Sequence, residues 1–169
     1  QEFEISMGRS LGPENQVTLE MGTEQIRLEV LKDYLPLTSG PDTVVQGPLV
    51  FAGFGISAPE LEYDDYRDLD VVGKIVLIFE HEPQEQAEES RFAGKELTPY
   101  ATVLYKVMNA KKRGAVGVIL LSDGLNHPPD EEPRSRRTRV ESIGIHTIRL
   151  TPEWSERLLE KGGRNSVEI

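Results

Sequence analysis

The sequence predicts an α+β fold that is mainly β, with a β-sandwich or open-barrel core and two flanking helices. Three observations predict it: several segments alternate apolar and polar residues with period two, two runs are apolar on both faces, and only two segments carry helical signals. The 169 residues suffice for one domain with a buried core, and the chain contains no cysteine. We therefore expect side-chain packing, rather than disulfides or thiolate-bound metal, to hold the fold.

Apolar residues occupy every second position in three segments near the N-terminus: Phe3, Ile5 and Met7; Val17, Leu19 and Met21; Ile26, Leu28 and Val30. Period two is typical of strands with one buried face, and the Gly-Thr pair at 22 and 23 predicts a hairpin turn. We expect residues 1–32 to form N-terminal strands and a hairpin, within or leading into a domain that spans residues 33–169.

Two later runs, residues 74–79 and 115–122, are apolar on both faces, which is typical of buried strands. The first is the best candidate for a central strand. Shorter strands are predicted within 49–56 and at 146–150. Two polar stretches, the mostly acidic residues 82–98 and residues 123–142 with the basic sequence "RSRRTR", predict long solvated loops.

Residues 99–114 carry the clearest helical signal. Apolar residues stand at 101, 104, 107 and 108, basic residues fill the last turn, and Gly114 follows as a stop. A second short helix is predicted to begin with Thr151 as N-cap and Pro152 at the first helical position. It carries Trp154, Leu158 and Leu159.

The net charge of −10 and the pI near 4.8 argue against nucleic acid and anionic membranes as partners, because both would be repelled, and leave binding of a cation or a basic peptide open. No apolar run approaches the roughly 20 residues of a membrane span. The chain starts at Gln1 and its first residues, "QEFEISMG", do not resemble a signal peptide. We expect a processed protein or a piece of a longer one.

The sequence does not match the residue spacing of the common catalytic and cofactor-binding motifs. The Gly-Lys pair at 73 and 74 has Asp68 where a phosphate loop needs glycine, and "GFG" at 53–55 has Ala58 in place of the third glycine of a dinucleotide site. "GISAP" has proline where a serine-hydrolase elbow has its second glycine. The three histidines, His81, His127 and His146, are far apart and form no zinc motif.

Four aspartates, Asp64, Asp65, Asp68 and Asp70, crowd the segment "YDDYRDLDVVGK". Carboxylates are hard oxygen ligands, so the cluster is a weak candidate for a cation site, although its spacing is not that of an EF-hand. The favoured interpretation is a structured turn in which the aspartates accept backbone N–H groups. The alternative function is a self-contained cation-dependent hydrolase that uses this cluster.

The segment "VVQGPLVFAGFGISAPELEYDDYRDLDVVGKIVLIFEHEPQE" and the later "KVMNAKKRGAVGVILLSD" resemble the protease-associated (PA) domain inserted in M28 zinc aminopeptidases. The resemblance covers roughly residues 33–160. The positions that fall on the pattern are Phe54, Tyr63, Asp64, Asp65, Tyr66, Asp70, Gly73, Lys74, Gly114, Ala115 and Gly117.

The resemblance implies a PA-domain-like β-sandwich or open barrel that is non-catalytic and lies beside a protease active site. Its partners would be the adjacent peptidase domain of the same chain and peptide substrates, and the location would be secreted or periplasmic. Two zinc ions would belong to the parent's catalytic domain, with no cofactor in this segment and no catalytic residue carried over. A PA domain from another exported protease or a receptor remains an alternative parent.

Three aromatic residues, Phe54, Tyr63 and Tyr66, are the candidates for substrate or partner contact. Tyrosine rings are large and amphipathic, so Tyr63 and Tyr66 suit a surface that faces a neighbouring domain or a substrate. Packing of one or both tyrosine rings in the core is the competing interpretation.

Overall fold

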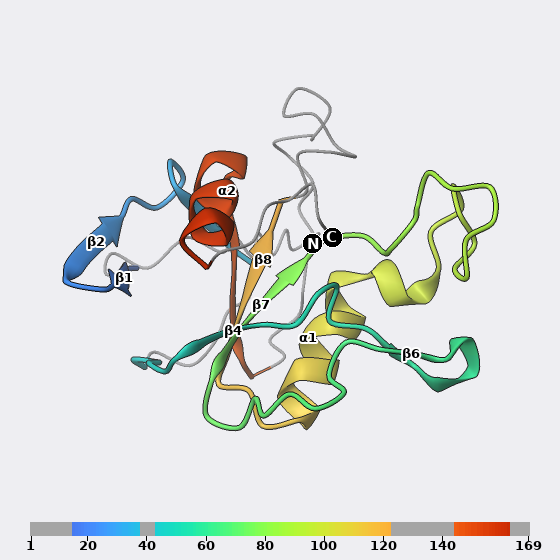
Figure 1. Ribbon diagram of the computed structural model, residues 1–169. Coiled ribbons are helices and arrows are strands. Elements are labelled where there is room, and N and C mark those ends of the chain that lie inside the picture. The colour runs from blue at the N-terminus through green and yellow to red at the C-terminus, as the bar shows by residue number, and fades with distance from the viewer. Residues whose placement is uncertain (1–14, 38–42, 123–143, 163–169) are drawn as a thin grey trace, which may run out of the picture.

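The structure is a computed structural model, and it describes residues 15–37, 43–122 and 144–162 (Figure 1). Its strands are β1 (Val17–Met21), β2 (Glu24–Leu28), β3 (Tyr34–Pro36), β4 (Leu49–Phe51), β5 (Ser57–Ala58), β6 (Tyr63–Asp64), β7 (Ile75–Phe79), β8 (Gly117–Leu121) and β9 (His146–Leu150). The helices are α1 (Val103–Lys112) and α2 (Pro152–Lys161), with short 3-10 helices at Pro59–Leu61 and Pro99–Ala101. The predicted class, mainly strands with two helices, is confirmed.

The centre is a mixed five-stranded sheet in the order β3-β9-β8-β7-β4. Strands β4, β7, β8 and β9 run parallel to one another, and β3 is antiparallel to β9. Val76 of β7 is paired with Val50 of β4 on one side and with Val118 of β8 on the other. The prediction that 74–79 forms an interior strand is therefore confirmed. Two small sheets, β1-β2 and β5-β6, flank the centre.

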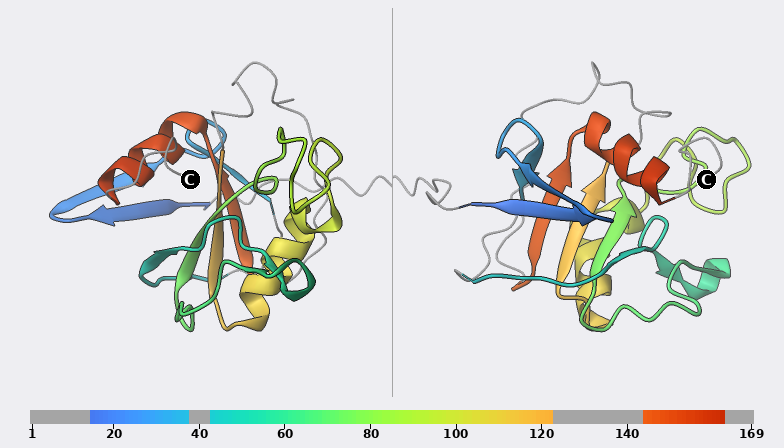
Figure 2. Two further views of the ribbon diagram at one scale, coloured as in Figure 1. Left: turned by 45° about the vertical axis from the view of Figure 1, so that its right-hand side comes forward. Right: turned by 60° about the vertical axis from the view of Figure 1, so that its left-hand side comes forward.

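Both faces of the central strands are buried, one under each helix (Figure 2). Successive side chains of a strand point to opposite faces. On one face, Leu77 and Ile119 share a core cluster with Trp154 of α2. On the other, Val76 and Val118 share a cluster with residues of α1. The double coverage explains why β7 and β8 are apolar at every position.

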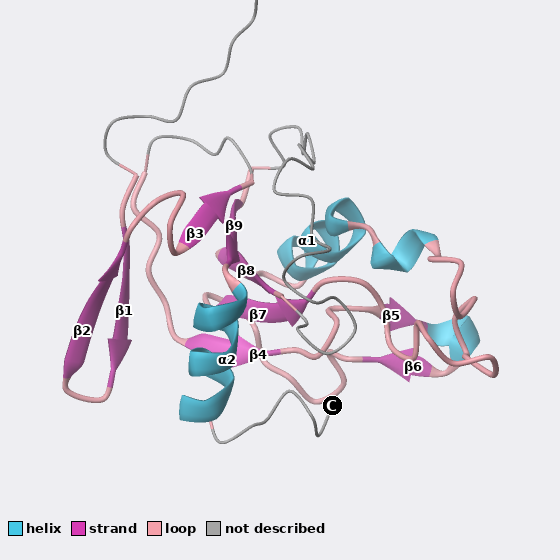
Figure 3. Ribbon diagram, turned by 90° about the horizontal axis from the view of Figure 1, so that it is seen from above, coloured by secondary structure: helices cyan, strands magenta, loops and turns pink. Residues whose placement is uncertain are grey.

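The N-terminal hairpin has the predicted form. Met21 pairs with Glu24 around a turn in which Gly22 takes a positive φ of 66°. Leu19 and Leu28 are buried in the same cluster as α2, and Figure 3 shows the hairpin beside that helix. The segment around Phe3, Ile5 and Met7 lies outside the described residues, and the boundary between 1–32 and 33–169 stays a prediction.

Helix α2 begins at Pro152 as expected, whereas α1 begins at Val103, after a 3-10 turn at Pro99–Ala101 within the predicted segment 99–114. Leu104 is 54% exposed, whereas Lys106, Val107 and Ala110 are buried. Helix α1 therefore packs against the sheet through a face that includes a lysine, while apolar Leu104 lies on the exposed side. Neither helix has the length and apolarity needed to cross a membrane, within the residues described.

Residues 82–98 lack helix and strand, as predicted, but they are not fully solvated. Glu82, Glu85 and Phe92 are buried, so the segment is folded against the domain. We call residues 82–98 the acidic loop. The predicted basic loop within 123–142 lies outside the described residues.

Candidate functional site

Asp65 joins the "YDDY" segment to the "GFG" turn. Its Oδ2 accepts hydrogen bonds from the backbone N–H of Phe54 (3.1 Å) and of Ile56 (3.0 Å), and its Oδ1 accepts one from the Tyr63 hydroxyl (2.7 Å). A Cβ at Gly53 would lie 2.3 Å from Oδ1, so only glycine allows this close approach. Burial raises the pKa of Asp65, although the two backbone donors and Tyr63 favour its ionised form.

Asp64 and Asp70 also accept backbone donors. Asp64 Oδ1 accepts from the Tyr66 N–H (3.1 Å), and Asp70 Oδ1 accepts from the Val72 N–H (3.1 Å). The hydrogen bond from Val72 adds to the pairing of Asp70 with the Lys74 amine, which holds the pKa of Asp70 below its usual value. The prediction that these aspartates serve a structured turn is confirmed for Asp64, Asp65 and Asp70.

Asp68 differs from the other three aspartates. It takes a positive φ of 63°, and its side chain makes no hydrogen bond to any described residue. Across the described ranges, no three histidine, aspartate or glutamate side chains gather in a group that could hold a metal ion. The structure therefore places the four aspartates within one short segment, where Asp64, Asp65 and Asp70 each accept hydrogen bonds from different donors and Asp68 accepts none from a described residue.

The three aromatic candidates occupy two different environments. Phe54 (9% exposed) and Tyr66 (6%) belong to the core, where the Tyr66 ring stacks on the Arg113 guanidinium at 4.6 Å. Tyr63 is half-buried and packs edge-on against Phe92 of the acidic loop at 5.2 Å. Desolvation raises the pKa of both tyrosines above the ordinary value. A contact role for all three residues stays a prediction.

Sequence reasoning missed Lys106, which is fully buried on α1. Its amine donates to the backbone carbonyls of Phe54 (2.7 Å) and Phe79 (2.8 Å), and thereby ties the "GFG" turn to the end of β7. Burial lowers its pKa to about 7, against the opposing attraction of nearby carboxylates, Asp65 first among them. The available signal was its spacing: Lys106 stands four positions before Ala110, so the two share one face of the helix.

Acidic residues that follow β7 are held by internal partners. Glu80 pairs with Arg149 of β9 at 2.5 Å, and buried Glu82 accepts from the Thr98 N–H and hydroxyl. The contact between Glu80 and Arg149 links the residue after β7 to β9, and the contacts between Glu82 and Thr98 join the two ends of the acidic loop. Glu82, one of the acidic residues on which the prediction of a solvated loop rested, is thus a buried hydrogen-bond acceptor.

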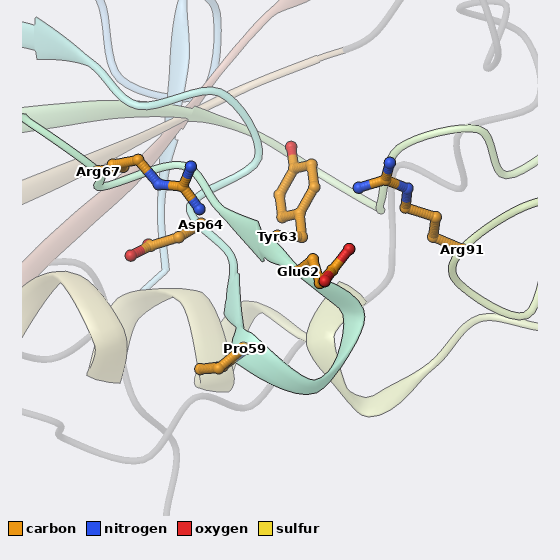
Figure 4. A pocket seen from close by; sticks show the side chains of 6 residues that line it. All are labelled: Pro59, Glu62, Tyr63, Asp64, Arg67 and Arg91. Atoms are coloured by element: carbon orange, nitrogen blue, oxygen red, sulfur yellow. The ribbon is translucent and has the colours of Figure 1, made fainter.

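An open pocket of about 530 Å³ lies between the β5–β6 hairpin and the acidic loop (Figure 4). Its lining residues are Pro59, Glu62, Tyr63, Asp64, Arg67 and Arg91. In Figure 4 the guanidinium groups of Arg67 and Arg91 point toward the Tyr63 ring from opposite sides. We call this the Tyr63 pocket. It offers two cations, an aromatic wall and two carboxylates, which are groups that bind a polar ligand.

A second, apolar groove of about 630 Å³ lies where the hairpin turn, edge strand β4 and the end of α2 meet. Met21, Leu49, Phe51 and Leu158 are among the residues that line it, and Lys161 stands at its margin. None of the sequence-predicted site residues lies in this groove.

The solved structures that resemble this chain include two aminopeptidases, both at low similarity. The aminopeptidase from Aneurinibacillus sp. strain AM-1 aligns at 20% identity and a TM-score of 0.48, over 92% of this chain and 29% of that one. BSAP, a zinc aminopeptidase from Bacillus subtilis, aligns at 19% identity and a TM-score of 0.44, over 85% of this chain and 27% of that one. This chain therefore spans less than a third of either enzyme.

The PA domain family model matches residues 45–153, whereas no curated protein matches the chain. The matched region contains β4, β7, α1, β8 and β9, and so most of the central sheet, together with the turn organised by Asp65. It covers well over half of the chain. The chain belongs to the PA domain family, as its motifs predicted.

Proposed function

We propose that this chain is the non-catalytic PA domain of an M28-type zinc aminopeptidase, and that it shapes substrate access and contacts peptides beside the catalytic domain. The observation that carries the proposal is the use of the "YDDY" motif. Asp64 and Asp65 of this motif, and Asp70 after it, use their carboxylates to accept hydrogen bonds from the chain's own backbone, so they have a structural role in the surface around this turn. The M28-type parent is proposed because the sequence motifs resemble those of the PA domain inserted in M28 zinc aminopeptidases.

The Tyr63 pocket is the part of that surface best suited to contact a peptide. The pocket is open and combines an aromatic ring with charged side chains, as sites that recognise polar ligands do. In this proposal two zinc ions are held by a catalytic domain outside this chain, and the parent protein is secreted or periplasmic.

The direct test is an activity assay on the 169-residue chain with added zinc and a series of aminoacyl p-nitroanilides. We expect no release of nitroaniline above the protein-free blank, while a known zinc aminopeptidase in the same plate releases it readily. Enzyme-like turnover by this chain would overturn the proposal. The coding sequence beyond Ile169 provides a second check: an H-x-D motif followed by acidic and histidine ligands is expected there.

The alternative, a cation-dependent hydrolase that uses Asp64, Asp65, Asp68 and Asp70, predicts a different measurement. Three of these carboxylates already accept backbone hydrogen bonds, and no group of three acidic or histidine side chains among the described residues could hold a metal ion. We therefore expect flat calorimetric titrations with calcium, magnesium and zinc. A saturable heat that disappears in an Asp64→Asn, Asp68→Asn double variant would favour the hydrolase.

A further inference from the structure

We propose that the Tyr63 pocket binds the carboxylate of an acidic peptide through Arg67 and Arg91. This inference rests on the proposed function and narrows it, because it names the class of peptide that the accessory surface would select.

The two arginines come from separate segments of the chain, and each is next in sequence to a buried aromatic residue. Arg67 comes directly after buried Tyr66, and its N–H donates to the Asp64 carbonyl at 3.4 Å. Arg91 comes directly before buried Phe92, whose N–H donates to the Ser90 hydroxyl oxygen at 3.1 Å. Both backbones are therefore fixed by the fold, although both side chains are exposed.

The charge balance leaves the pocket cationic. Asp64 lines it, but its Oδ1 already accepts the Tyr66 N–H and lies 3.5 Å from the Arg113 Nη2. Figure 4 shows the Asp64 carboxylate directed away from Tyr63. Neither Arg67 nor Arg91 forms a hydrogen bond or ion pair through its side chain with a described residue. The lining thus holds two guanidinium groups and two carboxylates, and because Asp64 is paired with Arg113, only Glu62 of the lining carboxylates is left to offset Arg67 and Arg91.

A guanidinium group presents parallel N–H donors that match the two oxygens of a carboxylate. Tyr63 completes the fit. Its hydroxyl is engaged by Asp65, so the ring rather than the hydroxyl is the part that faces a ligand. A carboxylate group of a peptide would pair with the two guanidinium groups, and the apolar atoms next to it would contact the Tyr63 ring. The carboxylate has two sources in a peptide: an aspartate or glutamate side chain, or the C-terminus.

Three short peptides separate these sources. Ac-Ala-Phe-Glu-Phe-Ala-NH2 carries only a side-chain carboxylate, Ac-Ala-Phe-Gln-Phe-Ala-OH carries only a terminal one, and Ac-Ala-Phe-Gln-Phe-Ala-NH2 carries neither. Each is titrated into the 15N-labelled 169-residue chain at low salt and followed by NMR through the Arg67 and Arg91 side-chain Nε–H signals and the Tyr63 amide. We expect saturable shifts with one or both carboxylate peptides and none with the neutral peptide.

The matched variants are Arg67→Gln, Arg91→Gln in the pocket and Arg27→Gln, Lys112→Gln outside it. Each pair removes two positive charges from exposed positions. We expect the pocket pair to raise the Kd of the carboxylate peptide about tenfold and the outside pair to change it less than about twofold, since exposed ion pairs contribute modestly and depend on distance. Raising NaCl to 0.5 M should weaken the wild-type complex as well.

Three results would overturn the inference: no shift at Arg67 and Arg91 with either carboxylate, equal shifts with the neutral peptide, or equal loss of affinity in both variant pairs. The zinc and nitroanilide assay remains separate from this titration. An inactive chain that ignores acidic peptides leaves the accessory function in place and removes only the carboxylate preference. A chain that hydrolyses nitroanilides removes the accessory function itself.

Discussion

Asp65 shows how one buried carboxylate organises two distant segments. It serves three donors, from Phe54, Ile56 and Tyr63, and the glycine at 53 allows it to approach. Asp68, three residues away, serves no described donor. The letters at the two positions are identical, so the sequence predicted that the aspartates form a turn but did not distinguish their roles. The distinction depends on a contact across eleven residues, which no local pattern contains.

A matched pair of substitutions tests this distinction. Asp65→Asn leaves a single acceptor oxygen for three donors, and we expect it to lower the free energy of unfolding by about 1–3 kcal/mol. Asp68→Asn keeps a residue that tolerates positive φ, and we expect a change within about 0.5 kcal/mol. Urea unfolding followed by Trp154 fluorescence measures both. Equal effects at the two positions would contradict the assigned roles.

Lys106 is buried and its pKa is lowered, so its contribution to the free energy of unfolding depends on pH. Because burial lowers its folded-state pKa to about 7, the folded protein releases this proton as the pH rises through 7, whereas the unfolded chain keeps it up to its ordinary value of 10.5. Between these two values the unfolded state binds more protons, so the contribution of Lys106 to stability rises with pH. Below pH 7 both states are protonated and the contribution is constant.

The Lys106→Met variant removes this titration together with the hydrogen bonds to Phe54 and Phe79. We expect it to be less stable than wild type at pH 9, and we expect the difference between the two proteins to grow by about 2 kcal/mol between pH 7 and pH 9. Chemical unfolding at four pH values measures this difference, in which other titrating groups cancel. A difference that is independent of pH would show that Lys106 stays charged when folded.

Among the elements, those with a strong local period were predictable. The β1–β2 hairpin, β7, β8 and α2 all follow apolar patterns with clear turn or cap residues, and the structure has them at the predicted positions. Strand β4 was expected only within residues 49–56, and its parallel pairing with β7 was not predicted, because strand partners are set by packing of distant segments. The acidic loop was misjudged in part, since Glu82 and Phe92 are buried by contacts far along the chain.

The N-terminal ends of the two helices also differ in a way that the sequence pattern did not predict. Thr102 and Thr151 both occupy N-cap positions, but only the Thr102 side chain accepts a hydrogen bond, from the Tyr105 N–H at 3.3 Å. We expect Thr102→Ala to destabilise the domain by about 1 kcal/mol and Thr151→Ala by less than about 0.5 kcal/mol. Thermal unfolding of the two variants beside wild type measures this. A larger loss at Thr151 would mean that its side chain caps α2 in solution.

At the scale of the whole molecule, the central sheet is covered on both faces while the surface carries a large excess of negative charge. The sequence predicted two helices but not their positions on opposite faces, because helix placement depends on the handedness of the β7-α1-β8 connection and on the fit of α2 against the hairpin. Composition alone gave the charge: 29 acidic residues against 19 basic ones. Such an imbalance destabilises the compact state through self-repulsion.

Salt should therefore stabilise this domain. Between about 20 mM and 500 mM NaCl the screening length falls from roughly 20 Å to about 4 Å, and repulsion between exposed carboxylates falls with it. We expect Tm to rise by about 2–5 °C, which corresponds to about 1 kcal/mol for a domain of this size.

The control is a triple variant, Glu24→Gln, Glu156→Gln and Glu160→Gln, at three exposed positions. It carries a net charge of −7 (−10 plus three). Its Tm should be higher at low salt and should rise less with NaCl. An equal rise in Tm in both proteins would show that NaCl stabilises the domain by a route other than screening of these carboxylates. Repulsion between surface charges would then not limit the stability of this fold.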